Sequence, residues 1–287
     1  MSRVAYVNGR FTPHREARVH VEDRGYQFAD GVYEVWAVFD GRLADLEGHL
    51  ARLERSLSEL EIPAPMPRLA LLAVLRETVR RNGVRDGLLY LQVTRGVARR
   101  DHAFPRPAVR PAVVVTAKLL DMAAVNRRAE AGGAVITTPE SRWARCDIKT
   151  VGLLPNALAK EAARKAGAIE AWFVDRDGLV TEGASTNAWI VTPGGVLVTR
   201  DTGANILRGV TRAAVLQCAA ELQMRVEERA FSVGEARAAA EAFISAASAF
   251  VTPITSIDGA RVGQGCPGPV ALRLRRLYLE TARASAA

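Results

Sequence analysis

The spacing of leucines in the first 120 residues predicts two helices that pack on strands. One helix is predicted from five leucines that recur at helical spacing, which are Leu46, Leu50, Leu53, Leu57 and Leu60. A second is predicted over 68–82, with Gly83 as its C-terminal stop. Residues 87–95 instead alternate apolar and polar side chains, which is typical of a strand with one face on a core. A further strand is predicted over 113–117.

Turn residues predict strands before the first of these helices. Asn8-Gly9 tolerates the positive φ of a type I′ turn and predicts a hairpin between 5–7 and 10–12. A glycine-punctuated loop from Asp23 then leads into a strand that ends near Phe39. Tyr33 and Val35 should share one face of that strand, because side chains alternate along it.

Strands and helices alternate in the second half of the chain. Pro155 suits the first turn of a helix that Gly167 ends. Short strands are predicted over 171–174, 179–181 and 188–191. Further helices are predicted from Gly209 to about Met224, at the capping box of Ser232 and Glu235, and after Pro269.

Composition indicates a globular protein. The 287 residues are 49% hydrophobic, which suffices for a large core in two domains or one large one. The three cysteines are widely spaced and have no metal-ligand spacing, so we expect reduced thiols, no metal site and a cytoplasmic location. No apolar core of signal-peptide length follows Met1, and we expect no membrane association.

The net charge of +8 raises the question of nucleic-acid binding. The arginines are scattered among glutamates, however, and their densest cluster, at 273–276, lacks interleaved aromatic residues for base stacking. We therefore expect solvated basic faces and no nucleic-acid partner.

One lysine lies inside an apolar run within 141–163. Its apolar sequence neighbours are Cys146, Ile148, Val151, Leu153 and Leu154. Desolvation of Lys149 would favour the neutral amine, which attacks a carbonyl to form a Schiff base. Most lysines near apolar residues bury only the stem and keep the ammonium in water, so this segment alone leaves both interpretations open.

Three further features, together with Lys149, point to pyridoxal phosphate. Glu182 follows a predicted strand and could hold the protonated pyridine nitrogen. Opposite charges about 4 Å apart attract by roughly 4 kcal/mol at an effective dielectric near 20, enough to keep a weakly basic nitrogen protonated. Arg52, on a helix face, and the N–H groups of Val210 and Thr211, at a helix start, could bind the phosphate.

Four segments carry a family resemblance over nearly the full length. They are Asp23-Arg24-Gly25-Tyr26-Gln27-Phe28, Gly31-Val32-Tyr33-Glu34, the run from Arg142 to Lys149, and Thr181-Glu182-Gly183 through Asn187. On these motifs the chain resembles the fold-type IV pyridoxal-phosphate enzymes, and among them the D-amino-acid aminotransferases. The resemblance implies a two-domain α+β or α/β fold. We expect a smaller N-terminal α/β domain over 1–118, a linker over 119–125, and a larger cofactor-binding domain over 126–287 with a barrel-like sheet.

The resemblance also implies roles for single residues. Lys149 would be the Schiff-base lysine and proton shuttle, Glu182 would hold the pyridine nitrogen, Leu207 would pack on the ring, and Ser185 would lie near the lysine. The implied phosphate ligands are Arg52, Val210, Thr211 and Ser248. Ala247 stands where the family usually has a threonine, so Ser245, Ser248 or backbone N–H groups would substitute for the missing hydroxyl. Ala184 replaces a frequent serine beside Glu182.

The resemblance extends to substrate choice. Arg100-Asp101-His102 matches the Arg-x-His pattern that, in D-amino-acid enzymes, reaches across a homodimer and joins Tyr33 as a trap for the substrate α-carboxylate. A planar guanidinium suits this because it binds a carboxylate with two parallel hydrogen bonds. We therefore expect ping-pong transamination, for example of D-alanine with 2-oxoglutarate to give pyruvate and D-glutamate.

Alternative functions of the same fold remain open. They are a branched-chain L-amino-acid aminotransferase, an (R)-amine transaminase and an aminodeoxychorismate lyase. The branched-chain enzymes usually follow their lysine with a Gly-Gly-Asn-Tyr-like loop, whereas Thr150-Val151-Gly152 follows here, and amine-specific enzymes need no carboxylate trap. A basic binding module without catalysis is a remote alternative.

Overall fold

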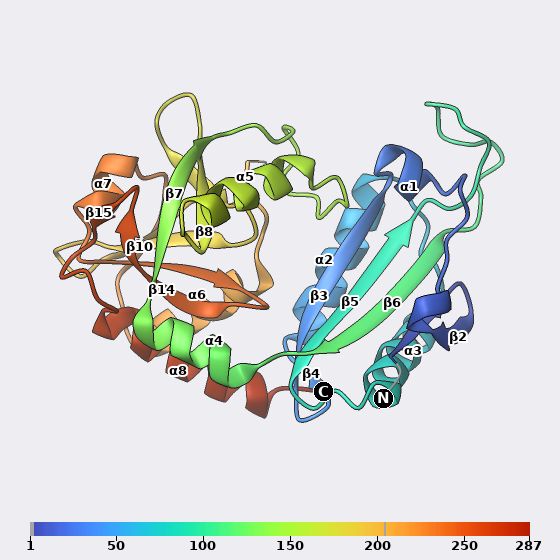
Figure 1. Cartoon of the computed structure of the whole chain (residues 1–287), viewed down its shortest axis with the longest axis horizontal. Helices are drawn as coiled ribbons and strands as arrows, with labels where there is room; N and C mark the ends of the chain where they lie inside the picture. Colours follow the sequence, from blue (N-terminus) through green and yellow to red (C-terminus); the bar gives the residue numbers. More distant parts are fainter. Residues whose placement is uncertain (1–2, 204) are drawn as a thin grey trace. The chain divides into compact units, whose positions relative to one another are not determined.

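The computed structural model describes residues 3–203 and 205–287, and the chain divides into two compact units (Figure 1). The first unit comprises Met1–Asp121, Ile148–Gly152 and Ser285–Ala287, and the second comprises Met122–Asp147 and Leu153–Ala284. The division after Asp121 falls inside the segment 119–125, and a helix, rather than an extended linker, begins at Met122.

The first unit is built on a six-stranded antiparallel sheet of order β2-β1-β6-β5-β3-β4. Its strands are β1 (Val4–Val7), β2 (Arg10–Pro13), β3 (Gly31–Phe39), β4 (Arg42–Leu43), β5 (Gly87–Thr94) and β6 (Ala112–Leu119). Its helices are η1 (His14–Glu16), α1 (Arg24–Phe28), α2 (Leu46–Glu59) and α3 (Arg68–Arg81). The hairpin predicted at Asn8-Gly9 is confirmed, with φ of 47° and 99° at the two turn residues.

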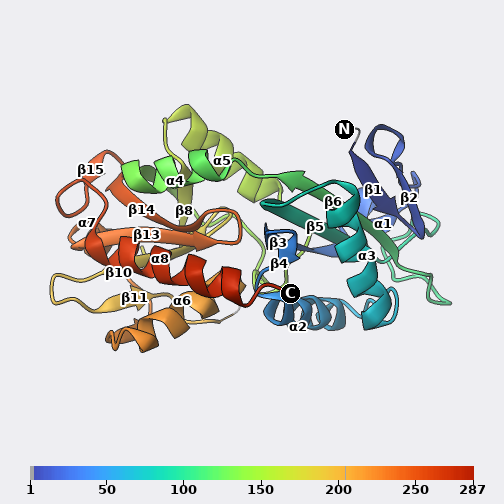
Figure 2. The same ribbon diagram turned by 90° about the horizontal axis from the view of Figure 1, so that it is seen from below.

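Helices α2 and α3, both predicted from the sequence, pack on one face of this sheet (Figure 2). Leu50 and Leu75 of the helices join Trp36 and Leu91 of the strands in a single buried core. Side chains alternate along β3, so the residues that flank Tyr33 face this core while Tyr33 itself points to the opposite face. This alternation places Tyr33 and Glu34, which are adjacent in sequence, on opposite faces of the sheet.

The second unit contains a nine-stranded sheet of order β12-β11-β10-β13-β14-β7-β8-β9, with β15 paired to β14, curled like a half-barrel. Its strands are β7 (Gly133–Pro139), β8 (Glu170–Val174), β9 (Val180–Gly183), β10 (Asn187–Val191), β11 (Leu197–Thr199), β12 (Val226–Glu228), β13 (Glu241–Ala246), β14 (Phe250–Ile257) and β15 (Ala260–Arg261). Its helices are α4 (Met122–Ala131), α5 (Leu154–Lys165), α6 (Val210–Glu221), α7 (Val233–Arg237) and α8 (Pro269–Ala284). The barrel-like sheet implied by the family resemblance is therefore present.

Local signals located α5, α6, α7 and α8 of this unit, whereas α4 was not predicted. Pro155 lies in the first turn of α5, α6 begins at Val210, and the Ser232 side chain accepts a hydrogen bond of 3.0 Å from the Glu235 N–H at the start of α7. None of the described helices is both long and apolar enough to span a membrane.

Candidate active site

Lys149 is fixed to the edge of β3 in the first unit. The Tyr33 N–H donates to the Lys149 carbonyl at 3.0 Å, the Val151 N–H donates to the Gly31 carbonyl at 3.1 Å, and Thr150 forms a bridge with Val32. These bonds give the lysine backbone a single position although it lies outside regular structure. The segment 148–152 therefore clusters with the first unit, while the sequence on both sides of it belongs to the second.

The Lys149 amine lies over an aromatic ring. Its Nζ is 4.2 Å from the ring centroid of Tyr33, and the Tyr33 ring is 5.7 Å from that of Tyr90. Burial, together with the nearby Tyr33, raises the pKa of Tyr90 to about 12, so this phenol stays neutral. A cation over an aromatic face is stabilised by about 0.5–2 kcal/mol, which helps to hold the amine at this place.

The apolar run around Lys149 is only partly an apolar environment. Cys146 and Ile148 are buried, but Leu153 and Leu154 are 39% and 71% exposed, and Lys149 itself is half-buried. Only part of the apolar run can therefore desolvate the lysine. The exposed residues are its neighbours in sequence, and α5 begins at Leu154 and takes that side chain to the surface.

Glu182 is a buried carboxylate at the end of β9 in the second unit. It pairs with the Arg142 guanidinium through a short contact, and it accepts hydrogen bonds of 3.1 Å from the Asn187 amide and from the Leu207 N–H. These donors hold both carboxylate oxygens in one orientation. The arrangement suits a group that must present negative charge to a ligand.

Arg142, which the sequence analysis did not assign, links Glu182 to a second carboxylate. Its Nη2 donates to Glu140 Oε2 at 2.6 Å, and its guanidinium lies 4.5 Å from the Phe173 ring centroid. Burial alone would lower the pKa of Arg142, but the hydrogen bond to Glu140 and the charge of Glu182 raise it, so the guanidinium stays charged. Arg142 opens a motif that carries the family resemblance, which is the one signal that could have identified it.

Helix α6 starts beside the Glu182 network. The Asn187 side chain also donates to the Leu207 carbonyl at 3.1 Å, and a Cβ on Gly209 would lie only 2.0 Å from Asn187 Oδ1. Gly209 therefore allows the start of α6 to approach Asn187. Gly209 is the N-cap of α6 and gives the first N–H groups no side-chain cap, so the N–H groups of Val210 and Thr211 suit an anion.

The serines predicted near the cofactor differ in their surroundings. The Ser185 hydroxyl donates to Glu170 Oε2 at 2.8 Å. Ser245 is buried and accepts from the Trp189 indole at 2.9 Å, whereas Ser248 is exposed in the turn between β13 and β14. Of the two candidates for the phosphate hydroxyl, Ser248 is the more accessible.

Arg52 is held by a carboxylate that the sequence analysis did not assign. Its Nε and Nη2 donate to the two oxygens of Glu34 at 2.7 and 2.8 Å, and His49 Nδ1 lies 2.7 Å from Glu34 Oε2. Burial alone would raise the pKa of Glu34, but the charge and hydrogen bonds of Arg52 lower it to about 2. Burial lowers the pKa of His49, so the ring is neutral near pH 7. Glu34 thus fixes the orientation of Arg52.

Arg100 and His102 lie in the exposed loop 95–111 between β5 and β6. The Arg100 guanidinium is 5.0 Å from the Phe28 ring centroid, and the His102 ring is 5.5 Å from the same ring. Arg24 of α1 holds the loop in place, because its Nη1 donates to the Asp101 carbonyl at 2.6 Å. Both predicted substrate groups are therefore gathered around α1 in the first unit, and their contact with substrate stays a prediction.

Comparison with known proteins gives one consistent family. The model of the amino-transferase class IV family matches residues 31–257. The D-alanine aminotransferase of Bacillus licheniformis is 43% identical over 263 residues, which cover 92% of this chain and 91% of that protein. The D-alanine aminotransferase of Staphylococcus haemolyticus is 39% identical over 270 residues, which cover 94% of each chain.

Solved structures of high similarity include branched-chain amino acid aminotransferases. The enzyme from Escherichia coli superposes with a TM-score of 0.91 at 25% identity and covers 100% of this chain and 97% of its own. The enzyme from T.th., solved with pyridoxamine 5'-phosphate, has a TM-score of 0.88 at 30% identity and covers 99% of this chain and 95% of its own.

Proposed function

This chain belongs to the class IV aminotransferases, and on that basis we propose that it transfers amino groups between D-amino acids and 2-oxo acids. It is an aminotransferase that depends on pyridoxal phosphate. D-alanine with 2-oxoglutarate is the proposed substrate pair. The observation that carries the proposal is the identity of 37–43% to D-alanine aminotransferases. The buried Glu182 carboxylate, which Arg142, Asn187 and the Leu207 N–H hold in one orientation, supports the cofactor.

The described residues fit the cofactor chemically. Pyridoxal phosphate requires an amine, an acidic partner for its ring nitrogen and donors for its phosphate. We assign these roles to Lys149, to Glu182, and to Arg52 with the N–H groups at the start of α6. Ser248, which is exposed and lies near the position of the usual family threonine, is the proposed additional phosphate ligand.

The chemistry of the residues then follows from their surroundings. Bound pyridoxal phosphate supplies an aldehyde and an electron-withdrawing ring that weakens the Cα–H bond of an amino acid. The Lys149 amine, whose backbone is held on the edge of β3, would accept and donate the proton at Cα of the bound amino acid. Glu182, which the Leu207 N–H orients, would hold a proton on the ring nitrogen, and Leu207 would lie against the ring. Ser185 is assigned a place near the lysine.

We assign the substrate carboxylate to Tyr33, Arg100 and His102. A carboxylate paired with a guanidinium forms charge-assisted hydrogen bonds, which are about twice as strong as neutral ones. We propose that Arg100 and His102 are contributed across a homodimer. Exposed aromatic side chains support such an interface, since Tyr26 and Phe104 of this region are 76% and 49% exposed.

Three free thiols, Cys146, Cys218 and Cys266, accord with the proposed cytoplasmic location.

The similarity to branched-chain enzymes provides one competing function. Their folds superpose on this chain with TM-scores up to 0.91, but at 24–31% identity, whereas the D-alanine enzymes reach 37–43%. An L-branched-chain activity is therefore the second candidate.

An amino-donor panel separates these functions. The purified holoenzyme is supplied with 2-oxoglutarate and, in parallel, with D-alanine, L-leucine or (R)-1-phenylethylamine, and D- and L-glutamate are quantified. The proposal requires D-alanine to be the best donor and D-glutamate to be the product. Faster turnover of L-leucine with L-glutamate as product would support the branched-chain function instead.

A further inference from the structure

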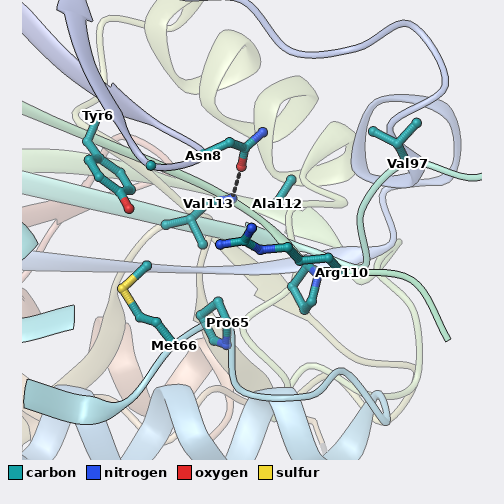
Figure 3. Close-up of a pocket in the computed structure, with 10 residues that line it drawn as sticks. Tyr6, Asn8, Pro65, Met66, Val97, Arg110, Ala112 and Val113 are labelled. Carbon is teal, nitrogen blue, oxygen red and sulfur yellow. Dashed lines mark hydrogen bonds between the residues drawn. The ribbon is translucent and has the colours of Figure 1, made fainter. Parts of the chain in front are cut away.

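A pocket of about 290 Å³ lies in the first unit, away from Tyr33 and Lys149 (Figure 3). Its walls come from the hairpin that carries Tyr6, from the Pro65-Met66 segment before α3, and from the two ends of the loop that joins β5 to β6. The pocket borders β1 and β6, whereas Tyr33 lies on β3. Strand β5 lies between β6 and β3 in the sheet. Two strand spacings, or roughly 10 Å, therefore separate β6 from the strand of the proposed active site.

Arg110 brings an unbalanced positive charge to this pocket. It is the one charged side chain among the ten residues that line the pocket. No described residue forms an ion pair or hydrogen bond with its guanidinium. Figure 3 shows the guanidinium reaching back over Pro65 and Met66 toward Tyr6. The pocket thus offers planar N–H donors without a protein acceptor.

Tyr6 brings an unpartnered hydroxyl to the same space. The residue is 7% exposed, and its hydroxyl has no hydrogen-bond partner among the described residues, although its ring packs on Phe11 at 5.2 Å. In Figure 3 the hydroxyl points into the pocket. The hydroxyl is therefore a donor on the pocket wall that a ligand oxygen can accept from.

The remaining surface of the pocket is mainly apolar. Pro65, Met66 and Val113 face the space between the two polar groups. One guanidinium and one hydroxyl match a single carboxylate, which the planar fork binds through two oxygens. The single positive charge would not balance the two negative charges of a phosphate dianion. A neutral apolar ligand would remove water from Arg110 without offering it a hydrogen-bond acceptor. The volume lies just below the range of about 300–1,000 Å³ for ligand sites, so the ligand is small.

We propose that this pocket binds a small monocarboxylate with a short apolar tail, at a site separate from the active site. The carboxylate contacts Arg110 and the Tyr6 hydroxyl, and the tail packs on Pro65, Met66 and Val113. Among the acids of the proposed reaction, pyruvate is a small monocarboxylate, whereas 2-oxoglutarate is not.

The site is built into the base of the loop that carries Arg100 and His102. Val97 and Arg110 line the pocket from the two ends of that loop. The ends are pressed together, since a Cβ on Gly96, whose φ is +106°, would lie 2.1 Å from the Arg110 carbonyl oxygen. A carboxylate on Arg110 would therefore restrain the loop that carries the proposed substrate groups. This consequence rests on the proposed function, whereas the binding itself does not.

Calorimetric titration of butanoate into the holoenzyme tests the binding. The variants are Arg110→Gln and Tyr6→Phe, and Arg99→Gln is the matched control, because Arg99 is exposed in the same loop and does not line the pocket. The visible absorption of the cofactor is recorded in parallel to report butanoate that enters the active site.

The proposal requires a binding event without a change in cofactor absorption. Arg110→Gln should weaken this event at least tenfold, Tyr6→Phe should weaken it severalfold, and Arg99→Gln should leave it as in the wild type. Equal affinity in wild type and Arg110→Gln, or an equal loss in both arginine variants, would overturn it. Inorganic phosphate is titrated as a second probe, and phosphate binding as tight as that of butanoate would also contradict a carboxylate site.

Hydrogen exchange tests the restraint of the loop. Butanoate should slow amide exchange in residues 96–111 of the wild type and of Arg99→Gln. It should leave the exchange of these residues unchanged in Arg110→Gln. Unchanged exchange in the wild type at saturating butanoate would refute the restraint. A wild-type enzyme that binds butanoate at Arg110 but does not turn over D-alanine would overturn the proposed function and leave this site standing.

Discussion

Replacement of Glu34 by glutamine should destabilise the first unit by about 3 kcal/mol near pH 7. Burial raises the pKa of Glu34, but the charges and hydrogen bonds of Arg52 and His49 outweigh this and lower the pKa from 4.5 to about 2. At about 1.4 kcal/mol per pH unit, this difference in pKa corresponds to that loss of stability. Removal of one partner of a buried ion pair costs a similar amount, about 3–5 kcal/mol. Because the folded pKa lies below the unfolded one, this stability is complete above pH 4.5 and is lost as the pH falls toward 2.

Native-state hydrogen exchange measures this loss where it should occur. The α2 helix carries Arg52 and His49, so its amides should exchange about 100-fold faster in Glu34→Gln at pH 7, after correction for intrinsic rates. The affinity for pyridoxal phosphate should fall in the same variant, because Arg52 loses the group that orients it.

Glu77→Gln is the matched control for this prediction. Hydrogen bonds from Arg80 and Arg81 also lower the pKa of Glu77 to about 2, but these residues lie on the exposed surface of α3, where pairs contribute little. Its exchange should therefore stay close to that of the wild type. Equal losses in Glu34→Gln and Glu77→Gln, or unchanged exchange in α2, would refute the assignment of Glu34 as the residue that holds Arg52.

Three further predictions concern the proposed active site. Lys149→Ala should abolish turnover of D-alanine while the protein still binds pyridoxal phosphate noncovalently, which borohydride reduction followed by mass spectrometry will distinguish. Glu182→Gln should lower kcat by up to about 1,000-fold, since roughly 4 kcal/mol of attraction is lost, and steady-state kinetics that show less than a threefold change would contradict its role. Arg100→Gln should raise the KM for D-alanine about 10- to 100-fold with little effect on (R)-1-phenylethylamine, and equal effects on both donors would argue against a carboxylate trap.

Local sequence signals located much of the first unit. The leucine spacing predicted α2 and α3 almost to their ends, and Asn8-Gly9 predicted the hairpin. The short helix α1 was not predicted, because the glycine at its second position indicates a loop. Its N-cap is Asp23, whose side chain accepts from the Gly25 N–H at 2.8 Å, and that cap stabilises a turn that propensity disfavours.

The central strands of the second unit were harder to predict. β13 and β14 are almost wholly buried, so they show no alternation of apolar and polar residues, and periodicity cannot distinguish such runs from buried helix. Helix α4 begins inside the segment 119–125, where the sequence analysis expected a linker. Its weak pattern gives one buried residue, Ala129.

The groups that hold the candidate site together could not be predicted from spacing. Glu34 and Arg52 are 18 residues apart, and Arg142 and Glu182 are 40 apart, so only the fold brings each pair together. The apolar neighbours of Lys149 left two interpretations open, and two of these neighbours are exposed. Its family motif, rather than its surroundings, was the signal that identified it.

The amino-group half-reaction tests the proposed function most directly. The holoenzyme is mixed with D-alanine or with L-leucine, without an oxo acid, while cofactor absorption and the released oxo acid are followed over one turnover. The account predicts that D-alanine discharges the cofactor absorption with about one pyruvate per active site, and that L-leucine reacts much more slowly. Faster discharge by L-leucine, or no discharge by D-alanine in a protein that carries cofactor, would contradict it.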